Sequence, residues 1–332
     1  MPEFRKDPFV DRWVIVSPER AKRPVDYGSS GEVSDNGECP FCAGHEAMTP
    51  PEILVLRSES EPPNSPQWTV RVVPNKYPAL VRDGSGTQIF DELHAAQVGI
   101  GAHEVIIESP SHVTDMALLS NEQLEAILRA YGGRIADLRD DRKFRYVLIY
   151  KNQGPEAGAT LEHVHSQLIA LPMVPKQVLE EIGAAKTYYE SKKRCVFCDV
   201  IRNETKGRER FVIDNDRFVV VCPFAPRFPY ETWILPKRHT SFFEHISQQD
   251  NCDLARILRE TLRRLNHCLS NPPFNYVIHS NPLDQDGNDY YHWHIEILPK
   301  LIQVGGFEWG SGFYINTVTP EQSARLLRQP LP

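Results

Sequence analysis

The chain of 332 residues carries the same order of chemical landmarks twice. Each half has a Cys-x-x-Cys turn, then a strand-like segment running from a glutamate to a histidine, and then a His-x-His pair. The glutamate and the first histidine are 8 residues apart in both halves, and the interval to the His-x-His pair is 51 residues in the first half and 53 in the second. This agreement indicates an internal duplication. The landmarks are Cys39, Cys42, Glu104, His112, His163 and His165, then Cys195, Cys198, Glu231, His239, His292 and His294.

Each half also carries one helical pattern and several short strand-like segments. Ser120 and Gln123 are typical of a capping box ahead of an apolar helical stripe, and the matching stripe in the second half covers 254–265. Short β-branched or aromatic segments bounded by Pro, Gly or Asn predict strands. These segments are 70–73, 104–108, 146–151, 165–171, 218–222, 232–235, 275–279 and 293–298.

The sequence therefore predicts an α+β fold of two similar halves, each with an antiparallel sheet and flanking helices. We expect an N-terminal half over 1–172 that carries the reactive group. A linker helix should cover 173–194, and a C-terminal half with a second metal site and a tail should cover 195–332.

Composition narrows the classes of function. Hydrophobic residues make up 41% of the chain, as in ordinary globular proteins, and the net charge of −7 argues against sequence-independent binding of nucleic acid. No apolar run approaches the roughly 18 residues that span a bilayer, and the first residues lack the apolar core of a signal peptide. We expect a cytoplasmic protein that binds neither nucleic acid nor membrane.

The duplicated Cys and His residues have the pattern of two metal sites. A Cys-x-x-Cys turn places two thiolates on one side of an ion, and two histidines complete a tetrahedron. With four protein ligands, each site is closed and structural, and we expect zinc, although the second ion could be iron. A redox pair or buried free thiols are the alternatives. The expected ligands are Cys39, Cys42, His112 and His163 in one site, and Cys195, Cys198, His239 and His292 in the other.

Alternation along a strand puts His163, His165 and Gln167 on one side of the predicted sheet. A neutral His165 imidazole is a competent nucleophile toward phosphorus, and the Gln167 amide could stabilise charge on a phosphate oxygen. The alternative is that His165 is a buried histidine of the core. The second half has Glu296 where the first has Gln167. A carboxylate repels phosphate, so we expect that site to be catalytically silent and His294 to be structural or to have a supporting role.

The run from Gly158 to Gln167, the opening segment 17–24 and the two Cys-x-x-Cys halves resemble the galactose-1-phosphate uridylyltransferase family of the histidine-triad superfamily. The resemblance implies a homodimer that moves a nucleotidyl group from a nucleotide hexose to a phosphate acceptor. His165 would carry the group as a covalent intermediate, in a UDP-glucose and hexose 1-phosphate reaction of galactose metabolism. Glutamine at position 167, where the related hydrolases carry a third histidine, disfavours hydrolysis.

The resemblance also implies substrate contacts. Arg20 and Arg23 would hold phosphate, Asn75 would meet the nucleoside, and Asn152 and Gln167 would meet the α-phosphate. The remaining implied substrate contacts are Thr160, Ser166, Phe307 and Glu308.

Several positions depart from the uridylyltransferase pattern. These are Val164, Ser166, Lys76 and the segment 302–308. The run 305–316 is similar to the ADP-glucose phosphorylase branch, which moves an adenylyl group from ADP-glucose to inorganic phosphate. That reaction is the enzymatic alternative, and a zinc-stapled nucleotide-binding module is the non-enzymatic one.

Overall fold

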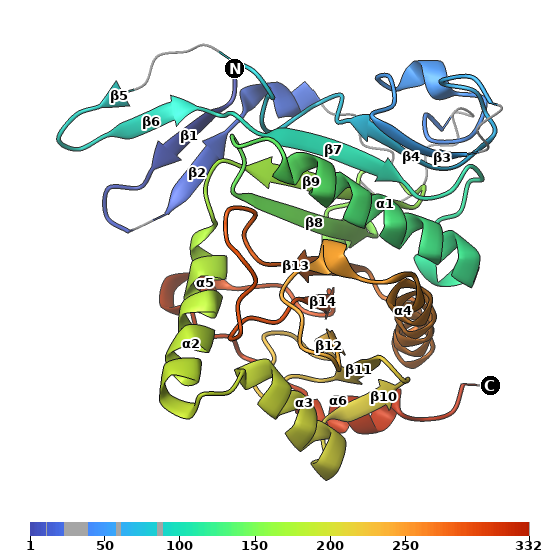
Figure 1. The fold of residues 1–332 in the computed structure, drawn as a ribbon, viewed down its shortest axis with the longest axis vertical. Coiled ribbons are helices and arrows are strands. Elements are labelled where there is room, and N and C mark those ends of the chain that lie inside the picture. Colours follow the sequence, from blue (N-terminus) through green and yellow to red (C-terminus); the bar gives the residue numbers. More distant parts are fainter. Residues whose placement is uncertain (11, 23–38, 58–60, 85–88, 332) are drawn as a thin grey trace.

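Ten strands join into one antiparallel sheet in the computed structural model, which describes residues 1–332 except 11, 23–38, 58–60, 85–88 and 332 (Figure 1). The strand order is β10-β11-β12-β14-β13-β8-β9-β7-β4-β3. The strands of the first half are β3 (Leu54–Arg57), β4 (Trp68–Pro74), β7 (Ala102–Ile107), β8 (Tyr146–Gln153) and β9 (His165–Leu171). Those of the second half are β10 (Phe211–Asp214), β11 (Phe218–Val221), β12 (Thr232–Pro236), β13 (Phe274–His279) and β14 (His294–Pro299).

The two halves contribute five strands each, in matching order, and meet where β8 pairs with β13. Tyr276 lies opposite Lys151 and Ile278 lies opposite Ile149 in this pairing. The expected α+β fold with antiparallel strands in two similar halves is confirmed. The structure adds that the two half-sheets are continuous, because an edge strand of each satisfies the backbone groups of the other.

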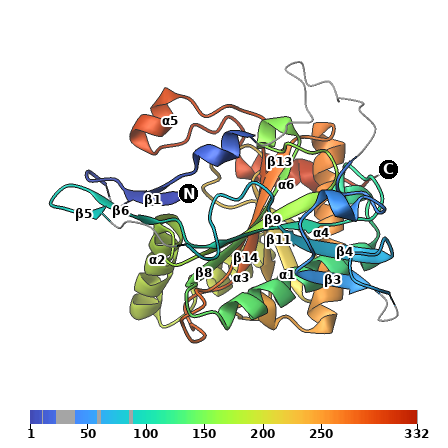
Figure 2. The same cartoon turned by 90° about the horizontal axis from the view of Figure 1, so that it is seen from above.

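Helices α1 and α4 lie side by side and cover one face of this sheet along both halves (Figures 1 and 2). Ser120 caps α1 by accepting from the backbone of Gln123, as expected. The Gln123 side chain does not complete the capping box, since it donates to the carbonyls of Thr69 and Glu108 instead. The helices are α1 (Asn121–Arg139), α2 (Lys176–Lys192), α3 (Val196–Gly207), α4 (Gln248–Leu269), α5 (Gly306–Ser311) and α6 (Pro320–Leu327).

The opposite face is covered differently in the two halves. In the second half, α2 and α3 pack their apolar residues onto β11 and β12. In the first half, the same face carries a small cluster around Phe41, Trp68 and Val105 and no helix of comparable length among the described residues. Helix α2 lies within the segment expected to be the linker. It covers this face of the sheet in the second half but not in the first.

A separate four-stranded sheet has the order β2-β1-β6-β5 and lies beside the first half (Figures 1 and 2). Its strands are β1 (Glu3–Lys6), β2 (Trp13–Val16), β5 (Ile89–Phe90) and β6 (Ala95–Val98). Among the described residues, no helix combines the length and the apolar character that crossing a membrane requires.

A buried ion pair lies beneath the join between the halves. Lys151 on β8 is 1% exposed and donates to Glu108, which is fully buried, and to the backbone carbonyl of His165 at 3.0 Å. Tyr131 on α1 donates to the same carboxylate at 2.7 Å and also contacts the hydroxyl of Tyr276 on β13. The network thus connects α1, strands β8 and β9 and the residue after β7 in the first half, and β13 of the second half.

We predict that Lys151→Met lowers the free energy of unfolding by about 3–5 kcal/mol, because it leaves the Glu108 carboxylate buried without a counter-charge. Urea unfolding followed by circular dichroism measures the change. The control Lys186→Met alters an exposed lysine on α2 and should stay within about 0.5 kcal/mol of wild type. The pair Glu108→Gln with Lys151→Met removes both charges and should be less destabilised than Lys151→Met alone. If Lys151→Met is as stable as wild type, the prediction is wrong.

Candidate functional site

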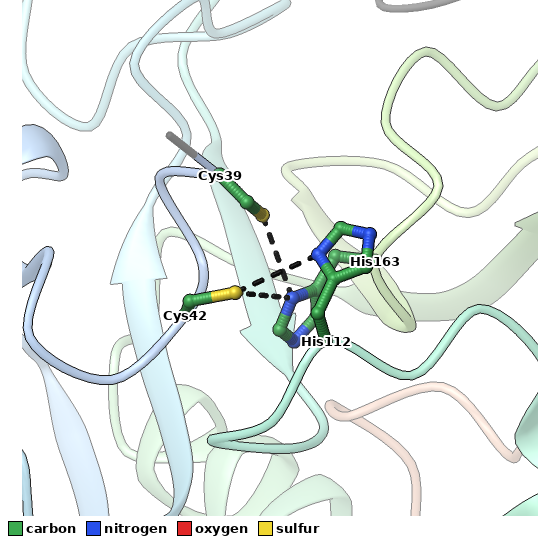
Figure 3. A group of neighbouring side chains, drawn as sticks. All are labelled: Cys39, Cys42, His112 and His163. Atoms are coloured by element: carbon green, nitrogen blue, oxygen red, sulfur yellow. Dashed lines mark hydrogen bonds between the residues drawn. The ribbon is translucent and has the colours of Figure 1, made fainter. Parts of the chain in front are cut away.

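Four side chains from three distant segments converge in the first half (Figure 3). Cys39 and Cys42 come from the turn before β3, His112 follows β7, and His163 lies two residues before β9. The Cys39 sulfur is 3.5 Å from Nδ1 of His163, and the Cys42 sulfur is 3.6 Å from Nδ1 of both His112 and His163. These are the four residues expected to form the first metal site.

The second half repeats the arrangement with the other four expected ligands. Cys198 lies 3.5 Å from Nδ1 of His239 and 3.7 Å from Nδ1 of His292. Cys195 stands at the N-cap of α3, so the helix start brings its two cysteines together. All four ligand atoms lie within 4.8 Å of one another, as they do in the first cluster.

Both clusters fit a tetrahedral ion. A sulfur about 2.3 Å and a nitrogen about 2.0–2.1 Å from one zinc ion would lie about 3.5 Å apart, close to the separations in both clusters. The Nε2–H of His163 donates to the Ser109 carbonyl at 2.8 Å, and that of His292 donates to the Pro236 carbonyl at 2.7 Å. Each Nδ1 therefore keeps its lone pair for a metal. Burial lowers the pKa of His163 to about 4, which also favours the neutral, ligating form.

A third group of potential ligands lies beside the second cluster. Glu181 on α2, His279 on β13 and His294 on β14 bring one ligand atom each to within 4.8 Å of the others. The rings of His279 and His294 stack with their centroids 4.9 Å apart. Sequence reasoning missed Glu181 and His279, because neither belongs to a duplicated motif. The three side chains could hold a further ion with a carboxylate and two imidazoles as donors.

His165 opens β9 and lines a cavity of about 400 Å³ in the first half. Its Nδ1–H donates to the carbonyl of His163 at 2.7 Å, which leaves the lone pair on Nε2. The ring of Phe41 packs edge-on against the imidazole with a centroid distance of 5.3 Å. The side chain is 7% exposed, and these two contacts hold the ring in place at the cavity.

Three other expected residues line the same cavity as His165: Gln167, Asn75 and Thr160. Gln167 is two residues further along β9 on the same face of the sheet. Its amide oxygen accepts from Nε2 of His103 at 2.9 Å and from the Tyr150 hydroxyl at 3.0 Å.

Sequence reasoning missed His103. The sequence signal for it is a single histidine in the apolar run of β7, two residues before Val105 and on the same face. That position has no histidine in the second half, so a search for repeated residues passes over it.

Other expected substrate contacts fall at the edges of the site. Arg20 donates to the Tyr77 carbonyl at 2.8 Å and lies 3.2 Å from Nδ1 of His103. Asn152 on β8 lines a small hollow together with His163 and His165. Arg23 lies outside the described residues.

Three expected contacts are not at the cavity. Ser166 faces the opposite side of β9, where its hydroxyl bonds Glu108 and Tyr276 in the buried network, so its assignment as a substrate contact is corrected. The strand alternation that points His165 and Gln167 into the cavity points Ser166 away from it. Phe307 and Glu308 lie on the exposed helix α5 and are absent from the described lining of the cavity within this chain.

The equivalent position in the second half is closed. His294 is completely buried, stacked on Trp233 and facing Glu181 of α2 at 3.5 Å. Glu296, which stands where the first half has Gln167, is bound by Arg227 and lies 3.5 Å from His279. Burial raises the pKa of Glu296, but hydrogen bonds from His279 and His294 and the nearby Arg227 charge lower it well below its ordinary value. The structural role expected for His294 agrees with this packing.

Comparison with known families gives a match over nearly the whole chain. Residues 1–175 match the family model described as galactose-1-phosphate uridyl transferase, N-terminal domain. Residues 181–331 match the model for the C-terminal domain of the same enzyme.

Among curated proteins, the ADP-glucose phosphorylase of Arabidopsis thaliana is 39% identical over 99% of this chain and 93% of its own length. The galactose-1-phosphate uridylyltransferase of Thermotoga maritima is 30% identical over 99% of this chain and 98% of its own length.

Solved structures give the same picture. The crystal structure of an ADP-glucose phosphorylase from Arabidopsis thaliana with bound ADP-glucose covers 100% of both chains, with a TM-score of 0.78 and 38% identity. A structure of uridylyltransferase covers 98% of this chain and 97% of its own, with a TM-score of 0.82 and 29% identity. These solved relatives therefore share the fold of this chain over almost its whole length.

We predict that each Cys–His cluster binds one ion, so the purified chain should contain about two thiolate-bound ions. Cys42→Ser and Cys198→Ser should each remove about one ion, and the double variant should lose both. Cys252→Ser is the control, since that thiol lies on α4 and donates to Glu125. Metal analysis by mass spectrometry measures the content. A chain without metal, or variants with unchanged content, would refute the assignment.

Proposed function

The chain belongs to the galactose-1-phosphate uridylyltransferase family and is a nucleotidyltransferase, and on that premise we propose that His165 carries the transferred group as a covalent intermediate. One observation carries this proposal: Nδ1 of His165 is occupied by the His163 carbonyl, while the side chain lines a cavity with the Gln167 amide. An imidazole held through Nδ1 in this way is preorganised to act as a nucleophile through Nε2.

The reaction has two displacements. Nε2 of His165 attacks the α-phosphorus of a nucleotide hexose, an N–P bond forms, and the bond to the bridging oxygen breaks so that hexose 1-phosphate leaves with the electron pair. An oxygen of the phosphate acceptor then attacks the same phosphorus and releases His165. The ring gains positive charge when the N–P bond forms, and the Nδ1–H bond to the His163 carbonyl stabilises that charge.

ADP-glucose with inorganic phosphate as acceptor is the substrate pair that we favour. The Arabidopsis phosphorylase shares more of this sequence than the Thermotoga uridylyltransferase does. Two departures from the uridylyltransferase pattern also favour ADP-glucose. They are Lys76, which lines the cavity, and the segment 305–316. UDP-glucose with hexose 1-phosphate remains the second candidate, supported by the family models and the Thermotoga relative.

We propose zinc for both Cys–His clusters, because two thiolates and two imidazoles are donors that zinc prefers. When bound, the ions supply positive charge that fixes loops and strand ends. In the first half His163 would connect the ion to the nucleophile, since its own carbonyl holds His165.

We also propose that the protein is a homodimer. Large apolar side chains on and after α5 are exposed, with Trp309 at 80%, Phe313 at 72% and Phe307 at 57%. Because Phe307 and Glu308 do not reach the cavity of their own chain, we propose that this segment completes the sugar pocket of a second copy. The rest of the proposed substrate contacts would come from one chain.

We predict that the wild-type protein, incubated with ADP-glucose and no phosphate, gains one adenylyl group and releases an equal amount of glucose 1-phosphate. Intact-protein mass spectrometry detects the adduct. His165→Ala should form none and should lower turnover on the order of 10⁴-fold or more, while its metal content and unfolding curve stay those of wild type.

Parallel incubations with UDP-glucose and UDP-galactose separate the two candidates. A uridylyl adduct with the UDP-sugars alone would assign the chain to the uridylyl reaction. Retention of uncleaved nucleotide sugar by metal-loaded protein, with no adduct, would favour a binding module and overturn the proposal.

We predict that the wild-type chain is a dimer by light scattering and that Trp309→Glu with Phe313→Glu makes it monomeric, because charges in an apolar contact are costly. The monomer should lose activity, since its α5 no longer reaches a second site. Phe224→Glu changes another residue that is 78% exposed and should leave the dimer intact. A monomeric wild-type protein with full activity would contradict this prediction.

A further inference from the structure

His103 occupies the space between several residues of the proposed site. It is 5% exposed and comes from β7, the strand that pairs with β9. Its ring contacts Gln167, Asn75 and Arg20, which are all expected substrate contacts. No duplicated motif includes it, and the two displacements described above give it no part.

The two shortest side-chain contacts of His103, to Ala79 and Gln167, indicate its protonation. The backbone N–H of Ala79, which can only donate, lies 2.9 Å from Nδ1. The Arg20 guanidinium also lies 3.2 Å from that nitrogen and is likewise only a donor. Nδ1 is therefore an acceptor, and the proton of the neutral ring is on Nε2. Nε2–H points at the Gln167 side-chain oxygen, 2.9 Å away. The Asn75 amide nitrogen, which is also a donor, lies farther from Nε2, at 3.2 Å.

The side-chain oxygen of Gln167 accepts a second hydrogen bond, from a residue on β8. Tyr150 lies directly opposite Gln167 in the pairing of β8 with β9, and its hydroxyl is 3.0 Å from the same amide oxygen. Gln167 is thus flanked by one donor from each neighbouring strand. Both lone pairs of its oxygen are used, so the NH₂ group has to face the remaining side.

We propose that His103 and Tyr150 are positioning residues that fix the amide orientation of Gln167. An amide can rotate by half a turn with little change in shape, and the wrong orientation would present an oxygen to the phosphate. Two donors on the oxygen make that rotation cost two hydrogen bonds. The inference rests on the proposed function, because it assigns the amide N–H to the transition-state charge at the α-phosphorus.

The test measures the single-turnover rate of adduct formation from ADP-glucose. His103→Leu should lower this rate about 10–100-fold, while the KM for ADP-glucose stays within about 3-fold of wild type. His103→Gln places an amide N–H near the position of Nε2 and should recover most of the rate. Tyr150→Phe should cause a smaller loss, because one donor remains. His94→Leu changes a histidine that is 70% exposed and serves as the control.

A double-mutant cycle separates positioning from general damage to the structure. If His103 acts through Gln167, then His103→Leu has little further effect in a Gln167→Leu background, because no amide is left to orient. An equal loss in both backgrounds overturns the proposal, and so does a wild-type rate for His103→Leu. Either result leaves the proposed function standing if the wild-type protein forms the adduct. A wild-type protein with no adduct refutes the function itself.

Discussion

The pairing of β8 with β13 is the interaction on which the rest of the structure depends. It turns two five-stranded units into one sheet, and it lets α1 and α4 form a single apolar layer over both. The buried Glu108–Lys151 pair lies at this join, with Tyr276 of the second half in its network. Lys151 also donates to the His165 carbonyl, so the same side chain supports the contact between the halves and the position of the proposed nucleophile.

The duplicated halves differ mainly in what covers the other face of the sheet. In the second half α2 brings Glu181 onto His294, and apolar residues of α2 and α3 fill the remaining space. In the first half the same surface is a cavity bounded by loops. The glutamate at position 296 is one reason to expect no catalysis in the second half. Helix α2 is a stronger reason, because it covers this surface whatever residue stands at position 296.

Most of the fold could be predicted from the sequence, because the duplication supplies each element twice. The strand expected at 165–171 is β9, and the eight Cys and His ligands lie in the two expected clusters. What the sequence could not reveal was contact between elements far apart in the chain. Ser166 was assigned as a substrate contact by its position in a motif, although residues alternate between the two faces of β9 and Ser166 faces the core. His103 and Glu181 became visible only when strand order and helix packing set them beside Gln167 and His294.

The hydrogen bond between His165 and the His163 carbonyl has an evolutionary consequence. In many enzymes a nucleophilic or basic histidine is oriented by a carboxylate, which one substitution can remove. Here the acceptor belongs to the main chain, and every amino acid would supply the same oxygen. The identity of the side chain at position 163 is therefore not constrained by this hydrogen bond. The orientation of the proposed nucleophile depends on the path of the backbone rather than on the identity of a partner side chain.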